Sequence, residues 1–223
     1  MAKNPQYQLI DGDIFDLTFR KPNVCICQQC NCVALKTHGL SKDIANMFGL
    51  YANSYARRKG KYTNIADPQS RGVPGSLEFC KGTPCVANLF SQYMYGKPGQ
   101  YNVSVKDDDL MKGITLDTYD TREEYMCTCL DNLLEILANN HADIDTVVFP
   151  YKIGCELAGG NWTRYVEMIN NFADKFMKLK NTNHVIIVKK DYDRAKKPRI
   201  TDESDSCDFS YADTTDSCPN GDD

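Results

Sequence analysis

The chain has 223 residues, enough for one good-sized domain or for one domain with a tail. Its hydrophobic and charged fractions, 42% and 25%, are ordinary for a soluble globular protein. No apolar run approaches the ~20 residues that span a bilayer, so no membrane segment is expected. The net charge of −4 hides an asymmetry, because residues 201–223 are strongly acidic and contain no Lys or Arg. The remaining, net positive part suits a small anionic ligand better than duplex DNA, which needs a dense basic stripe.

The cellular compartment of the protein decides whether its cysteines are expected to be thiols or disulfides. No apolar segment follows Lys3, so no signal peptide is predicted and the protein is expected inside the cell, in the cytoplasm, the nucleus or both. The 11 cysteines are therefore expected to be thiols. Cys25, Cys27, Cys30 and Cys32 raise the question of zinc, but the arrangement of two Cys-x2-Cys motifs, Cys-x2-Cys…Cys-x2-Cys, is absent, and the first two cysteines read as buried strand residues. Neither a metal nor a cofactor is expected.

The first predicted elements are two strands and a helix. Residues 7–10 read as a strand that residues 11–13 close with a turn, and residues 24–30 read as a second strand. Residues 39–58 carry apolar side chains at helical spacing and predict one amphipathic helix.

A loop, two strands and an insertion follow. Glycine and proline punctuate residues 60–75, which read as a loop. Residues 77–80 and 86–90 read as strands joined by a hairpin turn. Residues 96–119, rich in glycine, proline and aspartate, read as an insertion.

The last part alternates helices with strands. Thr121, with Glu124 three places on, predicts a capping box and a helix start. A strand at residues 146–149, a helix at 162–179 and a strand at 185–188 complete the pattern. Such alternation predicts a three-layer α/β/α sandwich with a mixed or mostly parallel central sheet.

The composition changes abruptly near residue 190. Residues 1–190 are expected to form one domain, and residues 191–223 a disordered acidic tail, because aspartate and serine dominate and aliphatic residues are few. The basic cluster at residues 194–199 reads either as a solvated linker, which is favoured, or as a nuclear address or anion patch.

Residues 148–162 are the most informative stretch. A short apolar strand leads through Gly154 and the pair Gly159–Gly160 to Asn161, a good N-cap, and then to a helix. Free backbone N–H groups, close ligand approach at glycine and the positive helix N-terminus together make an anion site, suited to a phosphate or pyrophosphate. A purely structural glycine-rich turn is the alternative.

Four segments in order resemble the macro domain, the fold that binds ADP-ribose. They are Ile10-Asp11-Gly12-Asp13-Ile14, then Gln29-Cys30-Asn31-Cys32 leading to Gly39-Leu40-Ser41-Lys42, then residues 86–96 with their Asn88-Leu89-Phe90, and finally residues 150–162. Together they cover roughly residues 6–189. The resemblance is strongest to the small branch that processes ADP-ribose-1''-phosphate.

The resemblance implies roles for individual residues. Asp13 would hold the adenine amino group beside the Ile14 backbone; taken without the other motifs, Asp13 reads rather as a turn cap. Asn31 would contact the distal ribose, the segment from Thr37 to Leu40 would face one phosphate, and residues 153–160 would wrap the pyrophosphate. The ligand-binding set implied is Asp13, Ile14, Asn31, Thr37, Gly39, Leu40, Gln92, Ile153, Gly154, Cys155, Leu157, Ala158, Gly159 and Gly160. An aromatic residue, Tyr93, Tyr95 or Tyr151, is available to stack on adenine.

Two departures from the family pattern supply the catalytic candidates. Relatives carry Gly-x-Gly where this chain has Thr37-His38-Gly39, so Thr37 replaces the first glycine and His38 adds an imidazole. Glu156 stands where relatives carry the second glycine of Gly-Cys-Gly. Hydrolysis at C1'' needs a group that activates water or protonates the leaving group, and His38 and Glu156 are the candidates. His38 reads alternatively as a surface or capping residue. A nucleophilic pair of His38 with Cys155 or Cys32 lacks an orienting third group.

Three functions remain open. The first is a metal-independent hydrolase of an ADP-ribose derivative, either ADP-ribose-1''-phosphate or an ADP-ribosyl ester. The related mechanism that uses a lysine and an aspartate is not supported, since Ala158 and Ser91 or Gln92 stand at those places. The second is a reader that binds ADP-ribose without turnover, and the third is an interaction protein acting through its acidic tail. The expected partner is ADP-ribose or an ADP-ribosylated substrate, nucleic acid only if ADP-ribosylated, and the expected state is a monomer.

Overall fold

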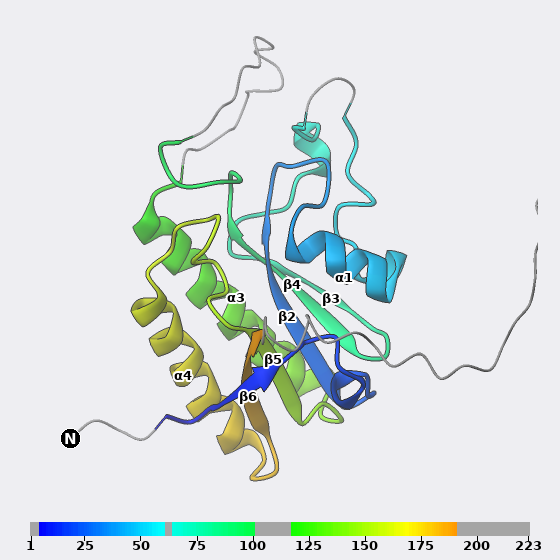
Figure 1. The fold of residues 1–223 in the computed structure, drawn as a ribbon, viewed down its shortest axis with the longest axis vertical. Helices are drawn as coiled ribbons and strands as arrows, with labels where there is room; N and C mark the ends of the chain where they lie inside the picture. Colours follow the sequence, from blue (N-terminus) through cyan, green and yellow to red (C-terminus); the bar gives the residue numbers. More distant parts are fainter. Residues whose placement is uncertain (1–4, 61–63, 101–116, 191–223) are drawn as a thin grey trace, which may run out of the picture. The chain divides into compact units, whose positions relative to one another are not determined.

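A computed structural model of the chain describes residues 5–60, 64–100 and 117–190 (Figure 1). These residues lie in one compact unit, residues 1–191. The predicted acidic tail, and most of the predicted insertion at residues 96–119, lie outside the described residues. None of the helices in the described ranges has both the length and the hydropathy needed to cross a membrane.

A six-stranded mixed sheet forms the centre. Its order is β1-β6-β5-β2-β4-β3, and every neighbouring pair is parallel except β3 with β4. The strands are β1 Gln8–Gly12, β2 Val24–Asn31, β3 Leu77–Cys80, β4 Cys85–Gln92, β5 Thr146–Pro150 and β6 His184–Lys190. All six predicted strands are confirmed. The first is longer than predicted, because Asp11 and Gly12 pair with the end of β6.

Helices cover both faces of the sheet (Figure 1). Helices α3 (Tyr119–Asn140) and α4 (Trp162–Leu179) pack on one face, and α1 (Leu40–Phe48) packs on the other. Strand β5 shows how the sequence fits two cores: Val147 and Phe149 point toward α3 and α4, whereas Val148 points toward Ile44 of α1. Because side chains alternate along a strand, a strand buried on both faces needs a continuous apolar run. The predicted three-layer α/β/α sandwich is confirmed.

Two helix boundaries differ from the predictions. The helix predicted over residues 39–58 is α1 alone, because Gly49 adopts a left-handed φ of 81° and closes it after Phe48. A short 3-10 turn, η2 Leu50–Ala52, follows, so the apolar spacing continued beyond the helix itself. The second helix begins at Tyr119, and the prediction that Thr121 caps it is wrong. Thr118 is the N-cap, and Thr121 completes the capping box with it.

Candidate functional site

The topology itself locates a crevice. Strands β2 and β5 are neighbours, but β2 leads to α1 on one face of the sheet and β5 leads to α4 on the other. Where adjacent parallel strands send their connections to opposite faces, the loops separate at the carboxyl ends of the strands, and ligands bind there. The predicted site residues all follow or end parallel strands at this edge.

Asp13 and Ile14 follow β1 at one end of this edge. The Asp13 carboxylate accepts a 3.0 Å hydrogen bond from the Phe15 backbone N–H through Oδ1, and Asp13 O accepts from Asp16 N–H. Asp13 therefore caps a turn, as the simpler interpretation predicted. This bond occupies one carboxylate oxygen, so a turn cap and an adenine contact remain compatible. Ile14 is buried against the α1 side of the sheet.

Asn31 ends β2 in the middle of the edge. Its amide oxygen accepts a 2.6 Å hydrogen bond from Ala34 N–H, and its amide nitrogen lies 3.3 Å from the Tyr55 hydroxyl. The Tyr55 hydroxyl also receives the Asn31 backbone N–H at 3.2 Å. The side chain of Asn31 is thus fixed in one orientation, with its oxygen turned toward the loop that follows.

The segment before α1 is open to solvent. Gly39, the N-cap of α1, has a φ of 54°, and a Cβ built there meets nothing within 4 Å. His38 is exposed; its backbone N–H donates to Ser41 Oγ at 3.0 Å, and Ser41 Oγ donates back to His38 O at 2.9 Å. The main chain of His38 is thus tied to the Ser41 side chain in the first turn of α1. The described residues provide no hydrogen bond to its imidazole.

The glycine loop, residues 151–160, contains several backbone N–H groups without a backbone acceptor among the described residues. Within the described residues, backbone acceptors are found for the N–H groups of Tyr151, Ile153, Cys155, Gly159 and Gly160, but not for those of Lys152, Gly154, Glu156, Leu157 and Ala158. Asn161 caps α4 as predicted, accepting from Thr163 N–H at 3.0 Å and Arg164 N–H at 3.4 Å. Unpaired amides beside a helix N-terminus are suited to an anion.

The glycines of this loop are required by close packing. A Cβ on Gly154, whose φ is 73°, would lie 2.4 Å from Gln29 Oε1 and 2.6 Å from the Tyr165 ring. A Cβ on Gly160 would lie 2.7 Å from Gly154 O and 2.8 Å from the same ring. The loop therefore rests directly on Tyr165 of α4 and Gln29 of β2. Any larger residue at either glycine would lift the loop.

A buried arginine ties this loop to the rest of the fold. Arg122, in the first turn of α3, donates to Ala158 O at 3.1 Å, Gly96 O at 2.7 Å and Met94 O at 3.0 Å. Asp117 pairs with its Nε at 2.7 Å. Sequence reasoning missed Arg122. A signal was present, because Arg122 lies on the same helical face as the buried Met126 and Cys129.

Gln92 ends β4 and is buried, with both ends of its amide engaged. Its Oε1 accepts from Gln29 Nε2, and its Nε2 donates to Met94 O at 3.0 Å. Ser91 Oγ donates to Gln29 Oε1 at 2.9 Å. The Gln92 side chain therefore supports the floor of the crevice, and its direct contact with a ligand stays a prediction.

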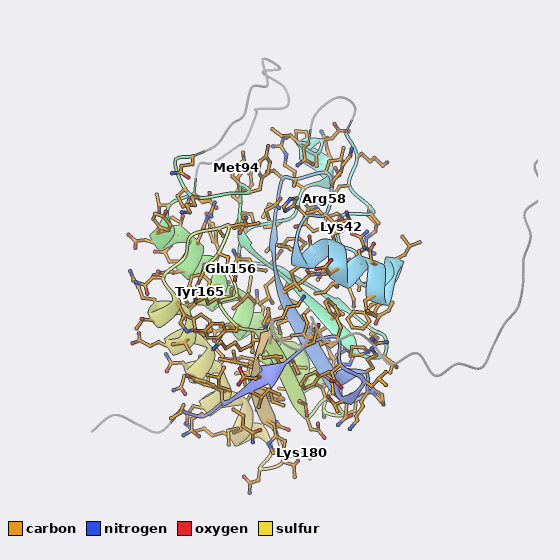
Figure 2. The ribbon with its side chains drawn as sticks, in the orientation of Figure 1. Lys42, Arg58, Met94, Glu156, Tyr165 and Lys180 are labelled. Carbon is orange, nitrogen blue, oxygen red and sulfur yellow. The ribbon has the colours of Figure 1, made fainter. Side chains whose placement is uncertain are left out.

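The two catalytic candidates come from opposite sides of the crevice. His38 precedes α1, whereas Glu156 lies in the loop before α4, on the side of Tyr165 (Figure 2). Both are exposed. Burial raises the pKa of the Cys155 thiol to about 12 and also raises that of Cys32, so both are protonated at neutral pH. A nucleophilic cysteine paired with His38 is not favoured. The described residues contain no group of three or more His, Cys, Asp or Glu side chains that could hold a metal ion.

The chain resembles solved structures but not curated sequences. No model of a known protein family matches it, and no curated protein does. A mutant of the Oceanobacillus iheyensis macrodomain superposes with a TM-score of 0.51 at 14% identity, over 86% of this chain and 90% of its own. The same macrodomain with ADP gives 0.50 at 16% identity, over 86% and 89%. The Trypanosoma brucei macrodomain gives 0.50 at 14% identity, over 84% of this chain and 63% of its own.

Proposed function

From the macrodomain fold of this chain, we propose that its crevice binds ADP-ribose. The observation that carries the proposal is the glycine loop, whose amides at Gly154 and Glu156–Ala158 have no backbone acceptor among the described residues at the N-terminal end of α4. A pyrophosphate needs such donors. Support comes from the O. iheyensis macrodomain, a structure of which holds ADP.

The ligand would lie along the carboxyl edge of the sheet. Its adenine would contact the carboxylate oxygen of Asp13 that does not accept from Phe15 N–H, and its pyrophosphate would lie between Gly39 and the glycine loop. Its distal ribose would reach Asn31. The open backbone at Gly39 supports this arrangement, because nothing within 4 Å would obstruct a phosphate that approaches it there.

Turnover is the finer part of the proposal. An ADP-ribose derivative substituted at C1'' would be hydrolysed by water, with His38 and Glu156 as the acid and the base on either side of the crevice. Both side chains are exposed. Ligand closure would be needed to bring them to the reacting bond, since apo geometry is often loose.

A reader module is the second candidate. It is favoured by Asn31, whose amide oxygen is already bonded to Ala34 N–H, and by the absence of any hydrogen bond to the His38 imidazole in the described ranges. Readers need only the binding surface, whereas a hydrolase must also orient a base.

The test combines calorimetry with a turnover assay. The full chain is titrated with ADP-ribose, and the phosphate released from ADP-ribose-1''-phosphate is then measured. Binding with release supports the hydrolase. Binding without release supports the reader or a different leaving group. If ADP-ribose does not bind at millimolar concentration, the proposal fails.

A further inference from the structure

A second buried arginine lies below the middle of the crevice. The Arg58 residue is 8% exposed, and its guanidinium stacks on the Tyr55 ring at 4.0 Å from the ring centroid. Its Nη2 donates to Asn31 O at 2.6 Å, and its Nη1 donates to Ala34 O at 2.5 Å. Arg58 therefore lies directly beneath the loop that carries Asn31. Figure 2 shows it on the α1 side, across the sheet from Glu156.

This guanidinium has no anionic partner among the described residues. The salt bridges in these ranges include the buried pair of Arg122 with Asp117, but none that involves Arg58. The titratable groups that act on it are Tyr55, Cys30 and Cys32. Burial raises the pKa of each, that of Cys30 to about 11, so all three are neutral at pH 7.

An uncompensated buried charge is costly and acts at a distance. Removing a cation from water without an anion is unfavourable, so chains rarely retain one unless it is paired. Two backbone carbonyls and an aromatic ring lower the cost but do not cancel the charge. Because Arg58 Nη2 contacts Asn31 O directly at 2.6 Å, solvent screens the field at Asn31 only weakly.

A negative charge near Asn31 would compensate the positive charge of Arg58. The exposed Glu156 is across the crevice, where solvent screens its charge. Within the part of the chain that the structure describes, the Asn31 end of the crevice therefore has no anion paired with Arg58. A ligand with a neutral hydroxyl at that end leaves Arg58 uncompensated, whereas an anionic group at that end compensates it.

We propose that Arg58 is a specificity-determining residue that makes the Asn31 end of the crevice select ligands with a negative charge there. The inference rests on the proposed binding of ADP-ribose, with the distal ribose at Asn31. Arg58 acts through space and need not touch the ligand. The preferred class is an ADP-ribose derivative with an anionic substituent, such as a phosphate, on the distal ribose.

The experiment compares two ligands that differ only at the distal ribose. Calorimetry on the full chain measures the dissociation constants of ADP-ribose and of its 1''-phosphonate, which carries the charge of the phosphate but cannot be hydrolysed. The wild-type protein is expected to bind the phosphonate at least about tenfold more tightly. The Arg58→Met variant is expected to reduce this ratio to about threefold or less, and Arg58→Lys to retain most of it.

The matched control is Arg57→Met. Arg57 is the preceding residue, with an exposed side chain paired to Glu78, so its removal deletes the same charge without changing the ratio. A wild-type ratio near one, or an unchanged ratio in folded Arg58→Met, overturns the inference. If neither ligand binds the wild-type protein, the proposed function itself has failed.

If the Arg58→Met variant does not fold, the salt dependence of the wild-type affinity ratio provides a second test. The effect of a surface charge fades between 50 mM and 500 mM NaCl, roughly as the Debye length shortens. A buried guanidinium keeps the wild-type ratio within about threefold over that range. A ratio that falls to one at high salt would assign the preference to surface lysines instead.

Discussion

Arg122 Nη1 donates a 3.1 Å hydrogen bond to the carbonyl oxygen of Ala158, which joins the first turn of α3 to the glycine loop. The same guanidinium donates to Met94 O and Gly96 O, beyond the end of β4. Three segments distant in sequence thus meet at one buried side chain. Arg122 positions the loop, and the buried Asp117 compensates its charge.

Replacing Arg122 by Met is expected to lower the free energy of unfolding by about 3–5 kcal/mol, because the buried Asp117 carboxylate loses its guanidinium counter-charge. Urea denaturation measures the change. Lys175→Met is the control: its partner Asp131 is exposed, so its loss should cost about 0–1 kcal/mol. A loss below ~1 kcal/mol for Arg122→Met would show that other groups, such as the Tyr93 N–H that donates to Asp117 at 2.7 Å, are enough to compensate its charge.

Gly154→Ala is expected to weaken ADP-ribose binding and to destabilise the fold by about 1–3 kcal/mol. Alanine is strained at the positive φ of position 154, and its Cβ would overlap Gln29 and Tyr165. Gly49→Ala separates strain from overlap, since Gly49 has a φ of 81° but an open Cβ position away from the crevice. It should be destabilised without losing affinity. Calorimetry and thermal melting of both variants decide, and equal affinity losses would contradict the packing argument.

Tyr165→Phe is expected to be neutral or to stabilise the protein by up to about 1–2 kcal/mol. The Tyr165 hydroxyl is buried and has no hydrogen-bond partner among the described residues, so folding desolvates it without compensation. Removing it leaves the ring beneath Gly154 and Gly160 in place. A loss of more than ~1 kcal/mol in urea denaturation would reveal a partner for the hydroxyl, such as a buried water.

His38→Ala and Glu156→Ala are expected to keep ADP-ribose affinity within about tenfold, or roughly 1.4 kcal/mol. Each should lower phosphate release by about 10²-fold if it acts as the acid or the base. Both residues are exposed, so neither substitution should change the thermal midpoint. Full turnover in both variants would show that neither His38 nor Glu156 takes part in catalysis. The proposal that the crevice binds ADP-ribose would still stand.

The fold should lose stability as the pH rises above about 9. Burial raises the pKa of Cys155 and Cys129 from 9.0 to about 12. The folded state therefore holds protons that the unfolded chain releases between about pH 9 and 12, and stability falls across that window. Urea midpoints at pH 8 and pH 10 measure the slope. Cys155→Ser should make it shallower, and an unchanged slope would assign it to other groups.

The strands could be predicted because this sheet is buried on both faces. Val147, Val148 and Phe149 form a continuous apolar run, and the run shows the strand before any topology is known. The ends of the helices were harder to predict than the strands. The apolar spacing at Tyr51 and Tyr55 continued past Gly49, so periodicity overestimated α1. Thr118 and Thr121 are both good caps, and the spacing of Thr121 from Glu124 favoured the wrong one.

The site was less accessible to sequence reasoning than the fold. The glycine loop and Asn161 are local in sequence, and local patterns showed them. Arg58 and Arg122 are not local, since each acquires its role from carbonyls brought close by folding. In the sequence they resemble solvated charges. Long-range hydrogen bonds to the backbone carry no residue-type signature, and so neither arginine was foreseen.

The pairing of β1 with β6 has a consequence for the order of synthesis. Strand β1 lies at the sheet edge and, among the described residues, has β6 as its one neighbour. On the ribosome, residues 8–12 must wait for residues 184–190 before they can join the sheet. The turn at Asp13 is thus the last part of the crevice to be set in place. A nascent chain that has already assembled the Asn31 end would still lack the turn at Asp13, where we propose that adenine binds.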